Sequence, residues 1–274
     1  MSIRPLPLLS VMLATGCVTI LGLDEDRELA ADGGAGGSSS IDGGAGASGA
    51  TAEAYAARVL KDGAVAYYRM EEAAGEFENE VAGGPAAVPS GKITRAVAGK
   101  LGSAAEFDGT SGKATIGDVF DFDGVQPMSI EVWIKWRDTK PLSGPDYHQI
   151  LHKGDSTANG QQGYNLSIDN TNSFTFTRIV DDGFFPARAT PQEDVWMYLV
   201  GVYDGNRVKL YVNGALAPKD APDTRPLPNT SGALVIGAAT NWGYFAGAID
   251  ELAIYDKALG AATVKMHYDL ANEP

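Results

Sequence analysis

Apolar and polar residues alternate with a period of two along several short stretches in the second half of the chain. The stretch MSIEVWIKW (128–136) has one wholly apolar face, made of Ile130, Val132, Ile134 and Trp136. The stretches GYNLSID (163–169) and NSFTFTRI (172–179) repeat the pattern, whereas VWMYLVGVY (195–203) is apolar on both faces. A period of two predicts half-buried β-strands, and the fully apolar stretch predicts a central strand covered on both sides.

Turn signals separate these stretches. The dipeptides Asp204-Gly205 and Asn213-Gly214 tolerate the positive φ that tight hairpins require, and further strand patterns follow in ALVIGA and GAIDELAIY. Many short strands with turn signals and little helix predict an all-β fold, a two-sheet antiparallel sandwich in a single domain.

Two short helices are expected to flank the sandwich. The first lies in TAEAYAARVLKDG (51–63), with Thr51 as its N-cap and Gly63 as its stop, and the second lies in LGAATVKMHYDLA (259–271).

The first 16 residues have a different pattern, in which Arg4 precedes an apolar run from 6 to 14 and then small residues. This is typical of a secretory signal peptide, and it is too short for a stable membrane-spanning anchor. The sequence LATGC around Cys17 resembles the lipobox of bacterial lipoproteins, which implies that Cys17 becomes the lipidated first residue. The alternative is an ordinary secretory signal with a chance cysteine.

Residues 17–50 continue as a tether. From 24 to 50 almost no side chain is apolar and larger than Ala, so this stretch cannot offset the entropy of ordering itself. As a Gly-rich coil it spans roughly 30 Å. We therefore expect a domain at 51–274 that is lipid-anchored in the bacterial cell envelope. Val18, rather than Asp, favours the outer membrane or cell surface.

Composition narrows the choice of partners. The net charge of −14 argues against a nucleic-acid partner, because phosphate binding needs a basic surface. Cys17 is the single cysteine, so no disulfide forms within the chain and no multi-cysteine metal site exists.

Several segments together resemble LamG-like domains, the laminin-G-like, concanavalin A-like lectin/glucanase jelly rolls. They are AVAYYRMEEAAG, GKLGSAAEFDG, MSIEVWIKW, WMYLVGVYDGNRVKLYVNG and GYFAGAIDELAIYDKAL, and they cover roughly residues 55–270. The resemblance implies a jelly-roll sandwich that binds carbohydrate or mediates adhesion. A protein-binding or structural module is the alternative, and a polysaccharide hydrolase is a weaker one, because fold alone does not fix the ligand.

The stretch AIDELAIY places two carboxylates, Asp250 and Glu251, side by side in an apolar run. Neighbours in a regular strand point to opposite faces, so these two are not expected to flank one glycosidic bond. On this parity Asp250 faces the core with Leu252 and needs a cation as partner. We expect an ion pair with Arg69. The alternative is one structural Ca²⁺, which the resemblance also implies, with Asp108 as a second ligand.

Other catalytic signatures are weak, so we expect no enzyme activity. The sequence has no Gly-x-Ser-x-Gly elbow and no glycine-rich phosphate motif. His148 and His152 in HQILH lie about 13 Å apart if they are on one strand, so they cannot share a zinc ion. His267 lies alone on the last helix, and we expect it to be structural.

Candidate ligand contacts come from loops and from one strand. Sugars pack their C–H groups against aromatic rings and hydrogen bond to amides and charged groups nearby. The loops TNWGYF and VDDGFFPAR combine these residue types, and the mixed face of 128–136 adds one tryptophan. The candidates for binding a glycan or a surface protein are Trp133, Asp181, Asp182, Phe184, Phe185, Arg188, Asn241, Trp242 and Tyr244.

Overall fold

The computed structural model describes residues 49–137, 147–157, 160–181, 183–184, 186–239 and 243–273. The signal peptide, Cys17 and the tether lie outside these residues, as do Asp182, Phe185, Asn241 and Trp242. Among the described residues, no helix combines the length and the apolar character that a membrane crossing requires.

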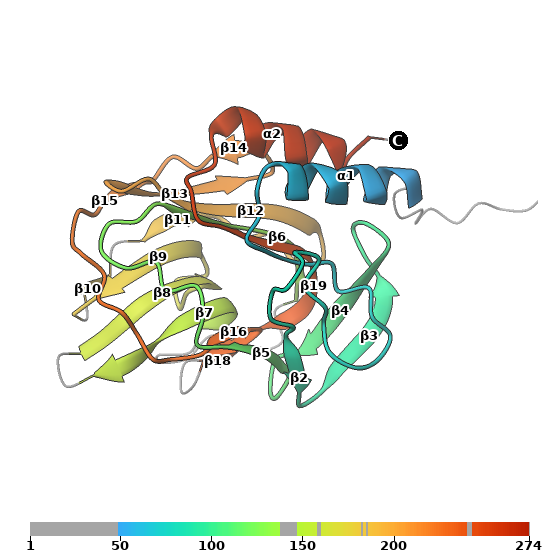
Figure 1. The fold of residues 1–274 in the computed structure, drawn as a ribbon, viewed down its shortest axis with the longest axis horizontal. Helices are drawn as coiled ribbons and strands as arrows, with labels where there is room; N and C mark the ends of the chain where they lie inside the picture. The colour runs from blue at the N-terminus through green and yellow to red at the C-terminus, as the bar shows by residue number, and fades with distance from the viewer. Residues whose placement is uncertain are drawn as a thin grey trace, which may run out of the picture. The chain divides into compact units, whose positions relative to one another are not determined.

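Two antiparallel sheets pack face to face (Figure 1). The first, here called the helix-covered sheet, has the order β14 (Ala215–Leu216), β13 (Arg207–Val212), β12 (Trp196–Tyr203), β6 (Met128–Trp136), β19 (Ala246–Tyr255), β4 (Ser103–Asp108), β3 (Ile93–Ala98). Two short strands join it, β1 (Ala66–Tyr68) beside β19 and β15 (Ala221–Pro222) beside β13.

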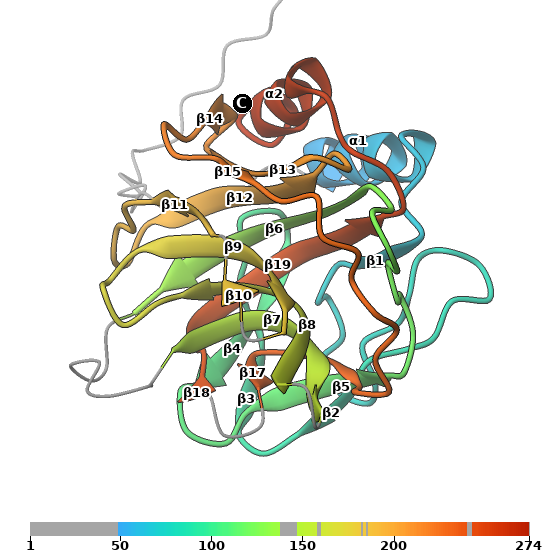
Figure 2. The ribbon, with the colours of Figure 1, turned by 90° about the vertical axis from the view of Figure 1, so that its left-hand side faces the viewer.

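The other, here called the second sheet, faces the viewer in Figure 2. Its order is β10 (Gly183–Phe184), β9 (Phe174–Val180), β8 (Gly160–Ile168), β7 (His148–Thr157), β16 (Leu234–Ile236), β5 (Lys113–Gly117), β2 (Val88–Ser90), with β11 (Ala187–Ala189) paired to β9. A small ladder joins β17 (Ala238–Ala239) to β18 (Gly243–Tyr244).

The predicted alternation places the core correctly. The apolar face of β6, from Ile130 to Trp136, lies between the sheets with Leu166 of β8 and Phe176 of β9. Strand β12 is buried on both sides, as predicted, because Leu199 packs in this core and its neighbour Val200 packs beneath the helices. The Asn213-Gly214 turn joins β13 to β14 with positive φ at both residues, as a tight hairpin requires.

Helices α1 (Gly49–Lys61) and α2 (Ala261–Leu270) cover the outer face of the helix-covered sheet (Figure 1). Tyr55 and Val59 of α1 and Val264 of α2 pack with Tyr198 of β12 in a second hydrophobic cluster. Helix α1 already begins at Gly49, so the prediction of Thr51 as N-cap is wrong. The helix ends just before Gly63, which has φ +79°, as the stop signal predicted.

Candidate functional site

The carboxylates of Asp250 and Glu251 lie on the same face of β19, not on opposite faces. Asp250 pairs with Trp133 of β6 and Ala253 pairs with Glu131, so three residue steps on β19 match two on β6. The extra residue is Glu251, which has φ +51°. A bulge of this kind turns two consecutive side chains to one side, so the regular-strand parity is wrong here. Both carboxylates point beneath the helices, and the prediction that Asp250 faces the core between the sheets is wrong.

Because of the bulge, Asp250 does not have the partner that the sequence predicted, and Glu251 lies beside Arg69 instead. Asp250 is fully buried, and its Oδ2 accepts hydrogen bonds from the backbone N–H groups of Lys100 (2.8 Å) and Leu101 (3.0 Å). Arg69 lies instead beside Glu251, with Nε 3.6 Å from Oε1, and Tyr67 donates its hydroxyl to the other oxygen. The predicted Arg69–Asp250 ion pair is therefore wrong. Burial raises the pKa of both carboxyls well above their ordinary values.

Asp108 and Asp250 do not form one calcium site. Asp108 pairs with Ala246, four residues from Asp250 along β19, which is a separation of about 13 Å. The Asp108 carboxylate closes its own turn by accepting from the N–H groups of Thr110, Ser111 and Gly112. No group of three or more His, Cys, Asp or Glu side chains suited to a metal occurs among the described residues. The proposed ligand pair Asp108–Asp250 is wrong.

A third buried acid, Glu131, was not singled out by the sequence. Its carboxylate accepts from Tyr55 (2.5 Å) and Tyr255 (2.9 Å), and it lies 2.9 Å from Nδ1 of His267. The other ring nitrogen of His267 is 2.8 Å from Asp62. Burial alone would lower the pKa of His267, but the two carboxylates outweigh it and the pKa is raised. His267 therefore links α2 to β6 and to Asp62, which directly follows α1, and the side chains of His267 and Glu131 are fully buried.

Trp133 belongs to the same covered face. Its side chain is 1% exposed and stacks on Tyr268 of α2, with ring centroids 5.8 Å apart, while Lys100 Nζ lies 4.8 Å from the ring. The prediction that Trp133 lines a ligand face is therefore wrong.

The outer face of the second sheet is where polar side chains converge. On β8 and β9 the residues between the core positions are small and polar. Gln149 and His152 of β7 lie on the same outer face of the sheet as these residues. We call this set the polar face: Gln149, His152, Asn165, Ser167, Thr175 and Thr177. The cross-strand register brings them together, because His152 pairs with Asn165 and Ser167 pairs with Thr175. Directly opposed residues share a face of a sheet.

The polar face forms the floor of a shallow hollow with a cavity volume of about 60 Å³. Two side-chain oxygens in it, Gln149 Oε1 and Asn165 Oδ1, are buried and accept no hydrogen bond from the described residues. Burial lowers the pKa of His152 to about 4, so its imidazole is neutral at physiological pH. Since buried polar atoms normally have partners, the floor offers two acceptors for donors that arrive from outside.

The rim of the hollow holds two of the predicted contacts. Phe184 of β10 is 46% exposed, and with Tyr147, Ile179 and Pro186 it supplies the apolar part of the lining. Arg188 of β11 also lines the hollow, where its guanidinium pairs with the carboxylate of Asp169. The rim therefore combines an aromatic ring with a charge-neutral ion pair.

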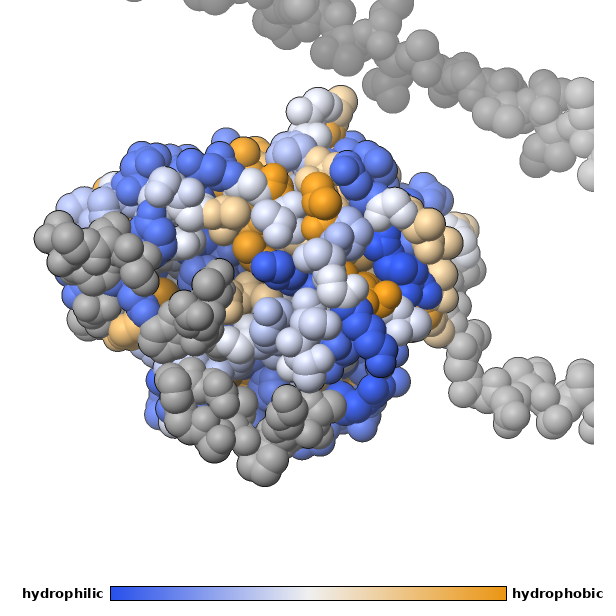
Figure 3. All heavy atoms as spheres, turned by 90° about the horizontal axis from the view of Figure 1, so that it is seen from below, coloured by the Kyte–Doolittle hydropathy of each residue, from blue (hydrophilic) through white to orange (hydrophobic). Residues whose placement is uncertain are grey.

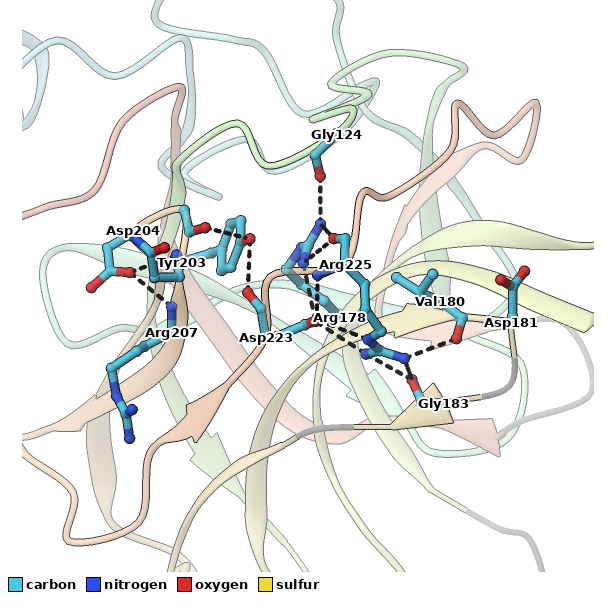
Figure 4. Close-up of polar contacts among 12 residues, drawn as sticks. Gly124, Arg178, Val180, Asp181, Gly183, Tyr203, Asp204, Arg207, Asp223 and Arg225 are labelled. Carbon is cyan, nitrogen blue, oxygen red and sulfur yellow. Dashed lines mark hydrogen bonds and ion pairs between the residues drawn. The ribbon is translucent and has the colours of Figure 1, made fainter.

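Arg178 and Arg225 form a hydrogen-bonded network with Asp223 next to the ends of β9 and β10 (Figure 4). Arg178 is buried, stacks 3.9 Å from the ring centroid of Tyr203 and donates to Asp223 (3.0 Å) and to the carbonyl of Gly124 (2.7 Å). Arg225 also contacts Asp223 and donates to the carbonyls of Val180 (3.0 Å) and Gly183 (3.3 Å). These bonds hold the end of β9 and the start of β10, and Phe184 directly follows Gly183 at the rim.

Two other predicted contacts within the described residues, Asp181 and Tyr244, lie outside the hollow. The carboxylate of Asp181 accepts from the side-chain amide of Gln162 at 2.5 Å, and it points away from Arg225 in Figure 4. Tyr244 is half-buried on β18, where its carbonyl lies 3.2 Å from His148 Nδ1. Neither residue lines the hollow. The sequence did carry a signal for the polar face: the Asn, Ser and Thr that alternate with the core residues of β8 and β9.

Two packed antiparallel sheets with this strand order and a polar outer face define a concanavalin A-like jelly roll. The chain belongs to the Laminin_G_3 family of the concanavalin A-like lectin/glucanases superfamily, whose profile matches residues 108–265. No curated protein sequence matches the chain.

Solved structures share the fold at low identity. Domain 4 of AbnA, a GH43 extracellular arabinanase from Geobacillus stearothermophilus, in complex with arabinotriose, has a TM-score of 0.58 and 19% identity, covering 76% of this chain and 98% of that one. The receptor-binding domain of botulinum neurotoxin C/D mosaic serotype gives 0.58 and 14%, covering 76% and 51%. Trypanosoma rangeli sialidase in complex with sialic acid gives 0.57 and 13%, covering 76% and 33%.

Proposed function

We propose that the domain is a non-catalytic carbohydrate-binding module and that the polar face is its binding site. The observation that carries the proposal is a pair of buried amide oxygens in one hollow, Gln149 Oε1 and Asn165 Oδ1, which have no hydrogen-bond partner among the described residues. Sugar hydroxyls are donors that can satisfy such oxygens, and the exposed ring of Phe184 at the rim offers an apolar surface to sugar C–H groups.

The distribution of apolar surface supports a sugar rather than a protein partner. Seen from below (Figure 3), hydrophobic residues form small groups separated by hydrophilic ones. The exposed large hydrophobic side chains of the described residues come from separate elements: Leu60, Val88, Val125, Phe184, Val195, Leu216 and Met266. Protein-docking surfaces are normally contiguous apolar patches. The fold is also shared with an arabinanase domain bound to arabinotriose, which is consistent with the proposal.

The carboxylates that line the described part of the hollow support the proposal of binding without hydrolysis. Among the described lining residues Asp169 is the single carboxylate, and it is held by Arg188 and by the N–H of Thr171 (2.9 Å). A glycosidase needs two carboxyl groups about 5 to 10 Å apart across the substrate. Glu131, Asp250 and Glu251 are all fully buried on the other sheet, beneath the helices.

We further propose that Cys17 is lipidated and that residues 17–50 tether the domain to the bacterial outer membrane or cell surface. The supporting observation is the signal-like run that ends in LATGC, followed by the Gly-rich stretch. Membrane fractionation of a Cys17→Ser variant tests this. We expect release of the protein into the soluble fraction, and unchanged membrane association would contradict the anchor.

Glycan-array binding of the purified full chain, followed by calorimetry on the hits, tests the binding site. We expect Gln149→Ala and Asn165→Ala to weaken binding at least fivefold. The matched control is Gln126→Ala, which changes an exposed amide outside the hollow and should leave binding unchanged. If no glycan binds the wild type, or if both floor variants bind as well as it does, the proposal is wrong.

A further inference from the structure

A second hollow lies at the edge of the sandwich, and Arg188 lines both this hollow and the one over the polar face. The second, here called the edge hollow, has a cavity volume of about 430 Å³ and lies between β11 and the β13–β14 hairpin. Its lining includes Ser173, Thr190, Leu216 and Lys219. The backbone of Arg188 forms an antiparallel bridge with Lys219, so the edges of the two sheets come together at this residue.

A row of hydrogen-bonding side chains leads from the centre of the polar face to this junction. Gln149 of β7 pairs with Ser167 of β8, Ser167 pairs with Thr175 of β9, and Thr175 pairs with Arg188 of β11. Neighbouring strands lie about 4.8 Å apart, so the row runs roughly 14 Å across the strands before it reaches the edge hollow. A second row, formed by His152, Asn165 and Thr177, runs beside it.

The charges along this path select the kind of ligand. His152 is neutral, and the positive charge of Arg188 is matched by Asp169. Lys219 adds a positive charge in the edge hollow, so the selection for a neutral group applies to the floor. The oxygens of Gln149 and Asn165 that have no partner among the described residues are acceptors, so an anionic group, which has no hydrogen to donate, leaves them unsatisfied. Hydroxyl groups, in contrast, donate to both. The floor therefore favours a neutral ligand that is rich in hydroxyls.

We propose that the ligand is a linear neutral oligosaccharide that lies across the strands, from the polar floor past Arg188 into the edge hollow. This inference rests on the proposed function and narrows it, because a single terminal sugar would occupy the floor alone. A path longer than roughly 14 Å accommodates more than a disaccharide. The apolar side chain of Leu216, which is 51% exposed in the edge hollow, packs against the distal sugar units of the oligosaccharide.

Calorimetry with ligands of increasing length tests this. The probes are linear arabinan, xylan and cellulose fragments from disaccharide to hexasaccharide, with galacturonate oligomers of equal length as acidic comparators. We expect one neutral series to bind with at least tenfold higher affinity for the hexasaccharide than for the disaccharide. Equal affinity at all lengths, or preference for the galacturonates, would overturn the inference while leaving carbohydrate binding intact.

Two variants test the contributions of the floor and of the edge hollow to binding separately. Leu216→Ala should weaken hexasaccharide binding at least threefold more than disaccharide binding, whereas Asn165→Ala should weaken both about equally. The control is Val195→Ala, which removes an equally exposed apolar side chain outside both hollows and should change neither affinity. If Leu216→Ala binds the hexasaccharide like wild type, the extension into the edge hollow is wrong. If no probe of any length or series binds the wild type, the inference is wrong as well. The glycan array then decides separately whether the proposed function stands.

Discussion

His267 on α2 and Glu131 on β6 form a fully buried pair, with His267 Nδ1 2.9 Å from Glu131 Oε2. The hydroxyls of Tyr55 and Tyr255 donate hydrogen bonds to the Glu131 carboxylate. Asp62 contacts the second ring nitrogen of His267. This polar cluster therefore links the helices to the sheet within an otherwise apolar contact surface.

Removal of His267 should destabilise the domain strongly. His267→Ala leaves Glu131 buried without its cation, and such a loss costs about 3–5 kcal/mol. Urea unfolding followed by tryptophan fluorescence measures the change in the free energy of unfolding. Met266→Ala, on the exposed side of the same helix, is the control and should change it by less than about 0.5 kcal/mol. A His267→Ala variant as stable as this control would show that the cluster contributes little.

The same histidine should make stability depend on pH. Its pKa is raised in the fold from an ordinary value of 6.5, so its contribution is fully present below about pH 6.5 and is lost as the pH rises through the folded pKa. The free energy of unfolding should therefore fall above pH 6.5, by at most about 1.4 kcal/mol per pH unit. Denaturation from pH 6 to 9 measures this, and His267→Gln should flatten the curve. Parallel curves for the two proteins would refute the assignment.

Asp250 should matter as a hydrogen-bond acceptor rather than as a charge. Asp250→Ala leaves the N–H groups of Lys100 and Leu101 without their acceptor, which should cost about 2–4 kcal/mol in the free energy of unfolding. Because burial raises the pKa of this carboxyl, the neutral Asp250→Asn, which keeps an oxygen, should lose less than about 1 kcal/mol. Thermal unfolding of both variants checks this, and equal losses would contradict it.

Chelation should not destabilise the domain. The Asp108 carboxylate is occupied by its own turn, and Asp250 lies about 13 Å away along β19. The Tm in EDTA and in millimolar Ca²⁺ should therefore agree within about 1 °C. The control is Asp108→Asn, which weakens the turn and should lower the Tm equally in both conditions. A Tm that rises with Ca²⁺ in the wild type and no longer does so in Asp250→Asn would instead place an ion at Asp250.

Much of the fold was predictable because it follows from local patterns. The alternation in β6, β8 and β9 identifies the core faces correctly, and the fully apolar β12 is indeed central. The candidate binding residues were harder to predict. Phe184 and Arg188 do line the hollow, but Trp133 lies beneath α2, because a helix distant in sequence covers its face of the sheet.

The sequence by itself determined which residues turn inward along each regular strand, since side-chain direction there depends only on a period of two. It could not determine the bulge at Glu251, because one extra residue is recognised only against the register of β6. For the same reason, Gln149, Asn165 and Arg188 come to line one hollow only through the pairing of β7, β8, β9 and β11. The tertiary structure thus showed that Asp250 and Glu251 are buried structural residues, and it assembled the polar face from residues up to 28 positions apart in the sequence, Gln149 to Thr177.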